Sequence, residues 1–87
     1  MLKELVGKEK VTGVKQSSRA VRSGLAREVF LANDADPALT APLLEQCRQK
    51  EIPVCQDYSM RQLGQAAGIQ VGAAVVAVLD NLYWSRA

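Results

Sequence analysis

Histidine is absent from all 87 residues of this chain, so the commonest general base and metal ligand is missing. The sequence also lacks a dinucleotide-binding fingerprint and a phosphate-binding loop ending in Gly-Lys-Ser/Thr. No carboxylates form an obvious catalytic pair, because Asp34 and Asp36 flank a helix start, where capping is the expected role. We therefore expect no enzyme, no metal and no cofactor, and the sequence favours binding over catalysis.

Long apolar runs and cysteines are also scarce. The longest apolar run, residues 73–79, fits one buried strand and is far too short to span a membrane. The N-terminal segment MLKELVGKEK carries charges throughout and has no apolar signal region. Cys47 and Cys55 have neither zinc-binding nor redox spacing, and their apolar surroundings predict two buried, reduced thiols. We expect a cytoplasmic protein with no membrane partner.

Aromatic residues make up only 5% of the chain whereas 48% of it is hydrophobic, so the core should consist of Val, Leu, Ile and Ala. A chain of 87 residues suffices for one domain with one core. Helical and strand patterns alternate with short connections, which predicts a single-domain three-layer α/β/α sandwich over residues 1–80. Residues 81–87, with Tyr83 and Trp84, form a tail whose position the sequence does not determine.

Periodicity, caps and helix-stopping residues predict the individual elements. The expected helices are 2–6, closed by Gly7; 15–23, stopped by Gly24; 37–50, started by Pro37; and 59–67, capped by Ser59 and stopped by Gly68. The expected strands are 11–12, 28–33, 52–56 and 73–79, the last covered on both faces. Side chains expected to face the core are Val14, Ser18, Val21 and Leu25 near the second helix, and Leu39, Leu43, Leu44 and Cys47 on the third.

Charge is unevenly distributed, although the net charge is only +2. Residues 1–27 contain seven basic and two acidic residues, whereas residues 28–87 contain four basic and seven acidic ones. Positive charge gathered at one end of a domain favours a polyanionic partner. On charge alone, a solvated helix face without a partner explains the asymmetry equally well.

The segment TGVKQSSRAVRSG places polar and basic side chains at the start of a helix. Lys15, Arg19 and Arg22 are spaced by four and three residues, so they share one helix face. The glycine before them lets a ligand approach the backbone, and a helix N-terminus favours a phosphate. Lys15 can donate to the acceptors of guanine, and the Gln16 amide can both donate and accept at a base edge. The pattern indicates contact with bases as well as with phosphates.

Three segments, GVKQSSRAVRSG, EVFLANDADP and RQLGQAAGIQVGAAVVAV, follow one another in this order. Together they resemble the ribosomal protein L-seven-Ae/L-thirty-e superfamily of kink-turn RNA binders, and within it the small stand-alone bacterial members of the YbxF type. The resemblance covers nearly the whole chain, from Val11 to Leu79. It implies a monomer that binds a kink-turn in ribosomal or other structured RNA, with no DNA partner.

The resemblance also implies residue roles. In the family this helix opens with Gly-x-Asn/Lys-Glu/Gln, whose side chains read the guanines of tandem sheared G·A pairs, and Gly13, Lys15 and Gln16 match that pattern. Arg19 matches a basic residue that supports the same bases or nearby phosphates. Asp36, before a proline, occupies the place of an acidic residue that touches a flipped nucleotide.

A short apolar loop that covers the extruded base in relatives corresponds here to Ile69, Gln70 and Val71. Several relatives carry an arginine in this loop and a lysine after the serine cap, where this chain has Val71 and Met60, with Arg61 beside it. This departure predicts a reduced affinity or RNA range. Inward packing is the alternative reading of Ile69 and Val71. The complete set of expected RNA-binding residues is Gly13, Val14, Lys15, Gln16, Arg19, Arg22, Asp36, Ile69, Gln70 and Val71.

The physical argument agrees with the resemblance, because a kink beside non-Watson–Crick pairs opens a groove that A-form RNA otherwise closes to side chains. The alternative function is a protein-interaction domain on the same scaffold, since a fold does not determine a function and relatives without an RNA role exist. The polar residues at the helix start favour RNA, whereas acidic or apolar residues there would have favoured the alternative.

Overall fold

The computed structural model describes residues 9–79. The helix expected at 2–6 and the tail at 81–87 lie outside the described residues. The elements, in chain order, are β1 (Lys10–Thr12), α1 (Val14–Arg22), β2 (Ala26–Leu31), α2 (Pro37–Gln49), β3 (Val54–Cys55), α3 (Met60–Ala67) and β4 (Val75–Leu79). The order of helices and strands expected for this range is confirmed.

The four strands form one mixed sheet in the order β1-β4-β2-β3. β4 runs antiparallel to both of its neighbours, pairing Val78 with Lys10 of β1 and Val75 with Leu31 of β2. β2 and β3 are parallel, and α2 provides the crossover between them. The last of the described strands, β4, therefore lies inside the sheet.

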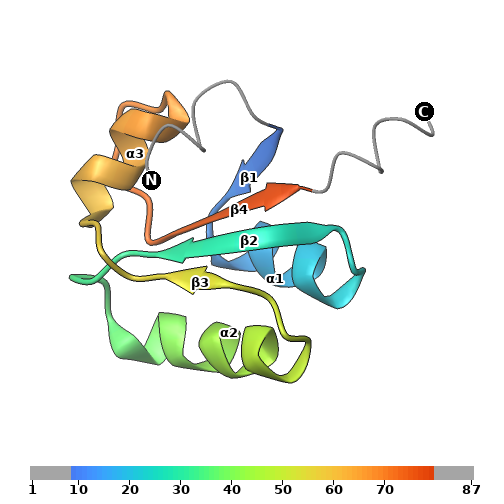
Figure 1. Ribbon diagram of the computed structural model, residues 1–87. Coiled ribbons are helices and arrows are strands. Elements are labelled where there is room, and N and C mark those ends of the chain that lie inside the picture. Colours follow the sequence, from blue (N-terminus) through green and yellow to red (C-terminus); the bar gives the residue numbers. More distant parts are fainter. Residues whose placement is uncertain (1–8, 80–87) are drawn as a thin grey trace.

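Alternate residues of β4 face opposite layers of helices. Val75, Ala77 and Leu79 pack in a core with residues of α1 and α2, whereas Val76 and Val78 pack with residues of α3. Every residue of β4 is buried, as expected for a strand covered on both faces. Figure 1 shows α2 and α3 on opposite sides of the sheet, and the three-layer α/β/α sandwich is confirmed.

Glycines and capping side chains explain where the helices end and begin. Gly24 and Gly68 adopt positive φ angles of 76° and 82° directly after α1 and α3, a conformation that favours glycine. α3 begins with a capping box, in which Ser59 accepts from the N–H of Gln62 and the Gln62 side chain accepts from the N–H of Ser59.

Two strands differ from expectation. β3 contains only Val54 and Cys55, because the N–H of Ile52 donates to the carbonyl of Cys47 at 2.9 Å and Pro53 has no N–H to donate. β2 begins at Ala26 rather than at residue 28, and it ends at residue 31 rather than at residue 33.

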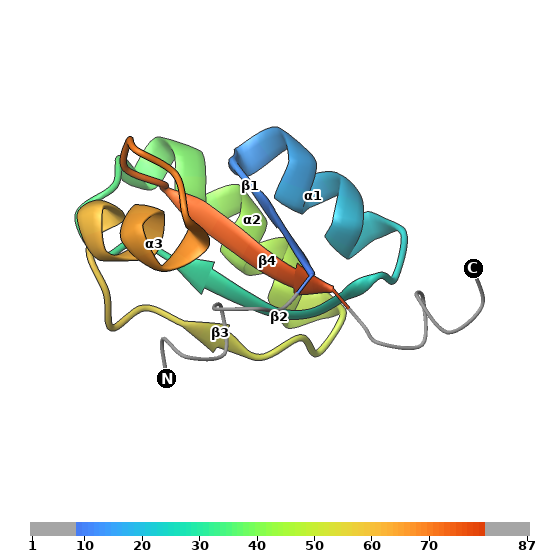
Figure 2. The same cartoon turned by 90° about the horizontal axis from the view of Figure 1, so that it is seen from above.

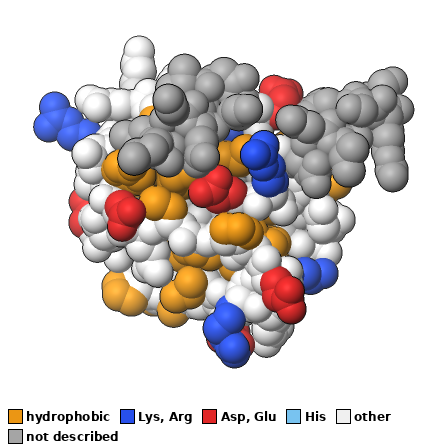
Figure 3. All heavy atoms as spheres, in the orientation of Figure 1, with side chains coloured by type: hydrophobic (Ala, Val, Ile, Leu, Met, Phe, Trp, Pro, Cys, Tyr) orange, Lys and Arg blue, Asp and Glu red, His pale blue; other side chains and the backbone are white. Residues whose placement is uncertain are grey.

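The residues buried on the helices also differ from the prediction. On α2, Leu43 and Cys47 are buried, but Leu39 and Leu44 are 49% and 36% exposed because they flank the buried stripe. Figure 3 shows hydrophobic side chains on the surface at the edge where α2 lies. Cys55 is half-buried, so the expected burial of both thiols holds only for Cys47.

On α1, the fully buried residues are Ser17, Ala20 and Val21. The expectation of an inward Ser18 is therefore only partly right, since Ser18 is half-buried and its hydroxyl donates to Gln46 of α2 at 3.0 Å. This hydrogen bond joins the two helices of one layer.

Candidate functional site

Three segments that are distant in sequence meet at one end of the sheet. The N–H of Gly13, before α1, donates to the carbonyl of Val75 at 2.8 Å, and the N–H of Ala32, after β2, donates to the carbonyl of Ala74 at 2.9 Å. Figure 2 shows the start of α1 and the loop before β4 at this same end. The predicted site residues at the start of α1, after β2 and before β4 are therefore brought to one end of the sheet, whereas Arg19 and Arg22 lie farther along α1.

We call residues 13–16 the tip of α1. Gly13 has a φ of 92°, no side chain caps the helix, and its first turn contains no acidic residue. An uncapped helix start leaves N–H donors and a partial positive charge available to an anion. Lys15 and Gln16 are exposed on this tip.

The basic side chains of α1 are not neutralised within the structure. Lys15, Arg19 and Arg22 are exposed, and they form no ion pair in the part of the chain that the structure describes. Arg48 on α2, by contrast, lies 2.6 Å from Glu45, whose pKa is lowered chiefly by the hydrogen bond from Arg48. Among the described residues, the charge of α1 is therefore not compensated by acidic side chains.

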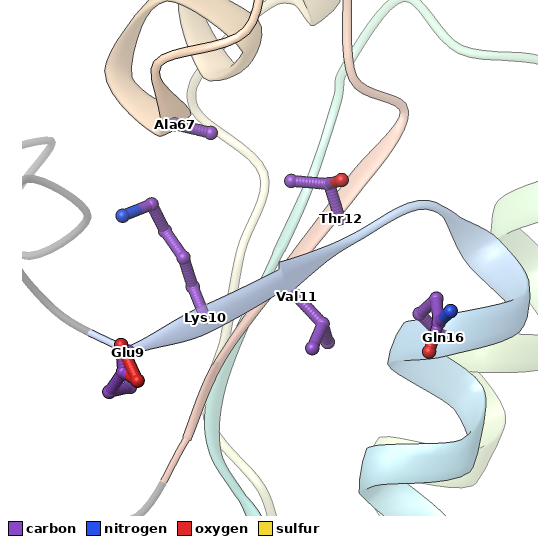
Figure 4. A pocket seen from close by; sticks show the side chains of 6 residues that line it. All are labelled: Glu9, Lys10, Val11, Thr12, Gln16 and Ala67. Carbon is purple, nitrogen blue, oxygen red and sulfur yellow. The ribbon is translucent and has the colours of Figure 1, made fainter.

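Gln16 borders a cavity of about 550 Å³ beside β1. Figure 4 shows Lys10 and Thr12 reaching from β1 toward Ala67 of α3, while Val11 and Gln16 lie on the side of α1. A second cavity of about 300 Å³ is also lined by Val11 and Gln16, together with Arg19. Val14, by contrast, is half-buried. It packs against the core that α1 and α2 form with one face of the sheet.

We call residues 69–72, between α3 and β4, the 69–72 loop. A cavity of about 450 Å³ lies beside it, lined by Asp34, Met60, Arg61, Gln65, Ile69, Gln70, Val71 and Gly72. Val71 is 71% exposed, whereas Ile69 is half-buried and packs on the core beneath α3. Ile69 and Val71, which were predicted to have the same role, therefore have different surroundings.

The two aspartates after β2 act on different helices. Asp36 accepts from the N–H of Ala38 at 2.9 Å and caps α2, the helix that follows it. Asp34 accepts from the N–H of Met60 at 2.8 Å, and so it caps the start of α3. Sequence reasoning missed this contact, because 26 residues separate the partners and no local motif joins them.

We also searched the described residues for a metal site, a membrane-spanning helix and a reactive thiol. Within residues 9–79, no group of three or more Cys, Asp or Glu side chains is arranged to hold a metal ion. In the same range, no helix combines the length and apolar character that a membrane crossing requires. Burial raises the pKa of the Cys47 thiol, which keeps it protonated.

Comparisons with known proteins identify a family and several named relatives. The sequence profile of the ribosomal protein L7Ae/L30e/S12e/Gadd45 family matches residues 2–84. An RNA-binding protein of Geobacillus sp. (strain WCH70) is 45% identical over 69 residues, which cover 79% of this chain and 84% of that protein. The RNA-binding protein YbxF of Geobacillus stearothermophilus is 44% identical, with the same shares of both chains covered.

Two solved structures share the fold. A protein of unknown function from Bacillus halodurans has a TM-score of 0.82 and 28% identity, with 98% of this chain and 89% of that chain covered. The 15.5kD RNA binding protein of Giardia lamblia also has a TM-score of 0.82, with 25% identity and coverage of 98% of this chain and 76% of that chain.

Proposed function

Because the chain belongs to the ribosomal protein L7Ae/L30e/S12e/Gadd45 family, as its three motifs predicted, we propose that it binds RNA and recognises kink-turns through tandem sheared G·A pairs. The relatives named as RNA-binding proteins and the Giardia lamblia 15.5kD RNA binding protein support the RNA partner. Kink-turn recognition is supported by the match of the α1 tip to the family pattern.

One observation carries the proposal. The tip of α1 presents Lys15 and Gln16 to solvent at an uncapped helix start, and this tip lies at the same end of the sheet as the 69–72 loop. Lysine and glutamine side chains can both pair with the edges of bases. A single RNA can therefore contact the polar tip and the apolar loop at once.

The two surfaces have complementary tasks in this proposal. Lys15 and Gln16 contact the guanines of the G·A pairs, while Arg19 and Arg22 along the same helix contact phosphates. Val71, exposed beside its cavity, covers the base that leaves the stack. Because the protein binds the bent RNA in preference to the extended one, it stabilises the kink.

A gel-shift comparison tests the proposed function. The probes are a generic kink-turn and the same duplex without its G·A pairs, at one salt concentration, since affinity for RNA depends on salt. We expect tighter binding to the kink-turn. Equal binding to both probes would reduce the function to general RNA binding, and no binding to either would refute it.

One observation favours a second candidate function, a protein-interaction domain. Leu39 and Leu44 are partly exposed on α2, a helix that contains none of the expected RNA-binding residues. The same gel shift separates the candidates, because a protein-interaction domain has no reason to prefer a kink-turn. We also propose that the protein is a cytoplasmic monomer, and the free thiols of Cys47 and Cys55 agree with a reducing compartment.

A further inference from the structure

We propose that Asp34 and Gly64 are positioning residues that hold the 69–72 loop ready for an RNA base without being its principal contacts. This inference rests on the proposed function and deepens it. Asp34 lies after β2 and Gly64 lies inside α3, and both act on the loop through backbone groups of α3.

Asp34 fixes the start of α3. The first N–H groups of a helix have no partner within it, and the Asp34 carboxylate accepts one of them, the N–H of Met60, at 2.8 Å. A neighbouring backbone bond, from the N–H of Asn33 to the carbonyl of Tyr58 at 2.9 Å, ties the same two segments together. The negative charge also lies favourably at the positive end of the helix. Asp34 therefore sets where Met60 lies.

Met60 in turn sets the far end of the loop. Its carbonyl accepts from the N–H of Ala73 at 3.0 Å, and a Cβ built on Gly72 would lie 3.2 Å from the Met60 Cβ. The backbone of the loop thus passes directly over the start of α3. One residue connects the Asp34 contact with the loop.

Gly64 lets the rest of the loop lie against the middle of the same helix. Glycine inside a helix lowers stability relative to alanine, so its presence calls for a packing reason. The reason is visible here, because a Cβ on Gly64 would overlap the carbonyl oxygen of Val71. The Gly64 carbonyl also accepts from the N–H of Ile69 at 3.0 Å. Bare backbone at residue 64 therefore determines how closely Val71 approaches α3.

The result is a loop whose apolar side chain is held in water before any ligand arrives. Val71 is 71% exposed, while the backbone on both sides of it is fixed to α3. A loop that is already ordered does not lose conformational freedom on binding, and this improves affinity without adding a contact. Asp34 and Gly64 supply that order.

The test uses three variants of the full chain: Asp34→Asn, Asp34→Ala and Gly64→Ala. An asparagine oxygen can still accept from the Met60 N–H, so Asp34→Asn is the matched control for the change in charge. For each variant we would measure kink-turn affinity, the salt dependence of that affinity, the melting temperature, and amide hydrogen exchange at Met60 and Ala73.

We expect Asp34→Ala to weaken kink-turn binding about tenfold, as expected when a preorganised loop is loosened, with the salt slope unchanged. It should speed exchange at Met60 and Ala73 and lower the melting temperature by about 5 °C. Asp34→Asn should bind within about twofold of the parent. Gly64→Ala should weaken kink-turn binding at least as much as Asp34→Ala, with the salt slope again unchanged, because α1 is untouched.

Opposite outcomes overturn the inference. If folded Asp34→Ala and Gly64→Ala both bind as the parent does, neither residue positions the loop. If Asp34→Asn loses as much affinity as Asp34→Ala while hydrogen exchange at Met60 and Ala73 stays as slow as in the parent, the carboxylate acts through its charge on the RNA and the positioning role is wrong. A parent protein that does not prefer the kink-turn would instead overturn the proposed function, and with it any recognition role of the loop.

Discussion

The tip of α1 and the 69–72 loop lie at the same end of the sheet, yet they are built in different ways. The tip is a run of consecutive residues whose polar side chains reach solvent because a helix starts there. The loop is apolar, and its position depends on Asp34 and Gly64, which come from two other parts of the chain. The tip of α1 is formed by residues that are adjacent in the sequence, whereas the 69–72 loop is held in place by contacts between distant segments. Substitutions should therefore change binding at the tip and affect binding and stability together at the loop.

The largest effect is expected at the tip. Lys15→Ala or Gln16→Ala should cost about 1–3 kcal/mol of kink-turn binding and reduce the preference over plain duplex, because we propose that each side chain contacts a base edge. Titration of both RNAs by gel shift measures this, and melting temperatures should not change, since both side chains are exposed. If both variants keep the affinity and selectivity of the parent, the tip is not the reading surface.

Substitutions of Ile69 and Val71 should separate an effect on stability from an effect on RNA binding. Ile69→Ser should destabilise the fold by about 1–3 kcal/mol, since its side chain packs on the core beneath α3. Val71→Ser should leave stability nearly unchanged and weaken kink-turn binding by up to about 1 kcal/mol, less than an aromatic stacking platform would lose. Denaturant titration alongside affinity distinguishes these results. A stable Ile69→Ser together with an unstable Val71→Ser would reverse the assignment.

A smaller effect is expected farther along α1. Arg22→Ala should weaken binding to all RNAs alike and reduce the salt slope by about one, because we propose that this side chain contacts phosphate rather than a base. Arg48→Ala is the matched control, since Arg48 is also exposed but already pairs with Glu45. A loss confined to the kink-turn, with the slope unchanged, would mean that Arg22 reads the RNA structure.

The smallest effect on RNA is expected on the inner side of α1. Ser17 is fully buried, and its hydroxyl has no partner among the described residues. Ser17→Ala should therefore stabilise the protein by about 1 kcal/mol and leave RNA affinity unchanged. Chemical unfolding measures the gain. A loss of stability would reveal a hydrogen bond that the Ser17 hydroxyl makes.

The sequence predicts features that depend on neighbouring residues better than features that depend on tertiary contacts. The start of α1, the caps at Ser59 and Asp36 and the buried strand β4 were predicted correctly, because each depends on neighbouring residues or on a periodic pattern. The contact of Asp34 with Met60 was not predictable, since capping rules look only a few residues ahead. The different surroundings of Ile69 and Val71 were also hidden, because they depend on how closely the loop approaches Gly64.

The place of β4 inside the sheet has a consequence for how the protein is made. β1, which leads directly into α1, pairs only with β4 among the described strands, and Lys10 lies opposite Val78. A ribosome therefore synthesises the α1 tip long before the strand that fixes it, and at about 5–20 residues per second that delay lasts several seconds. Nascent chains that stop short of β4 should expose Val11 and the inner face of α1 to chaperones. The proposed RNA-binding tip is thus held in place only after β4 has left the ribosome.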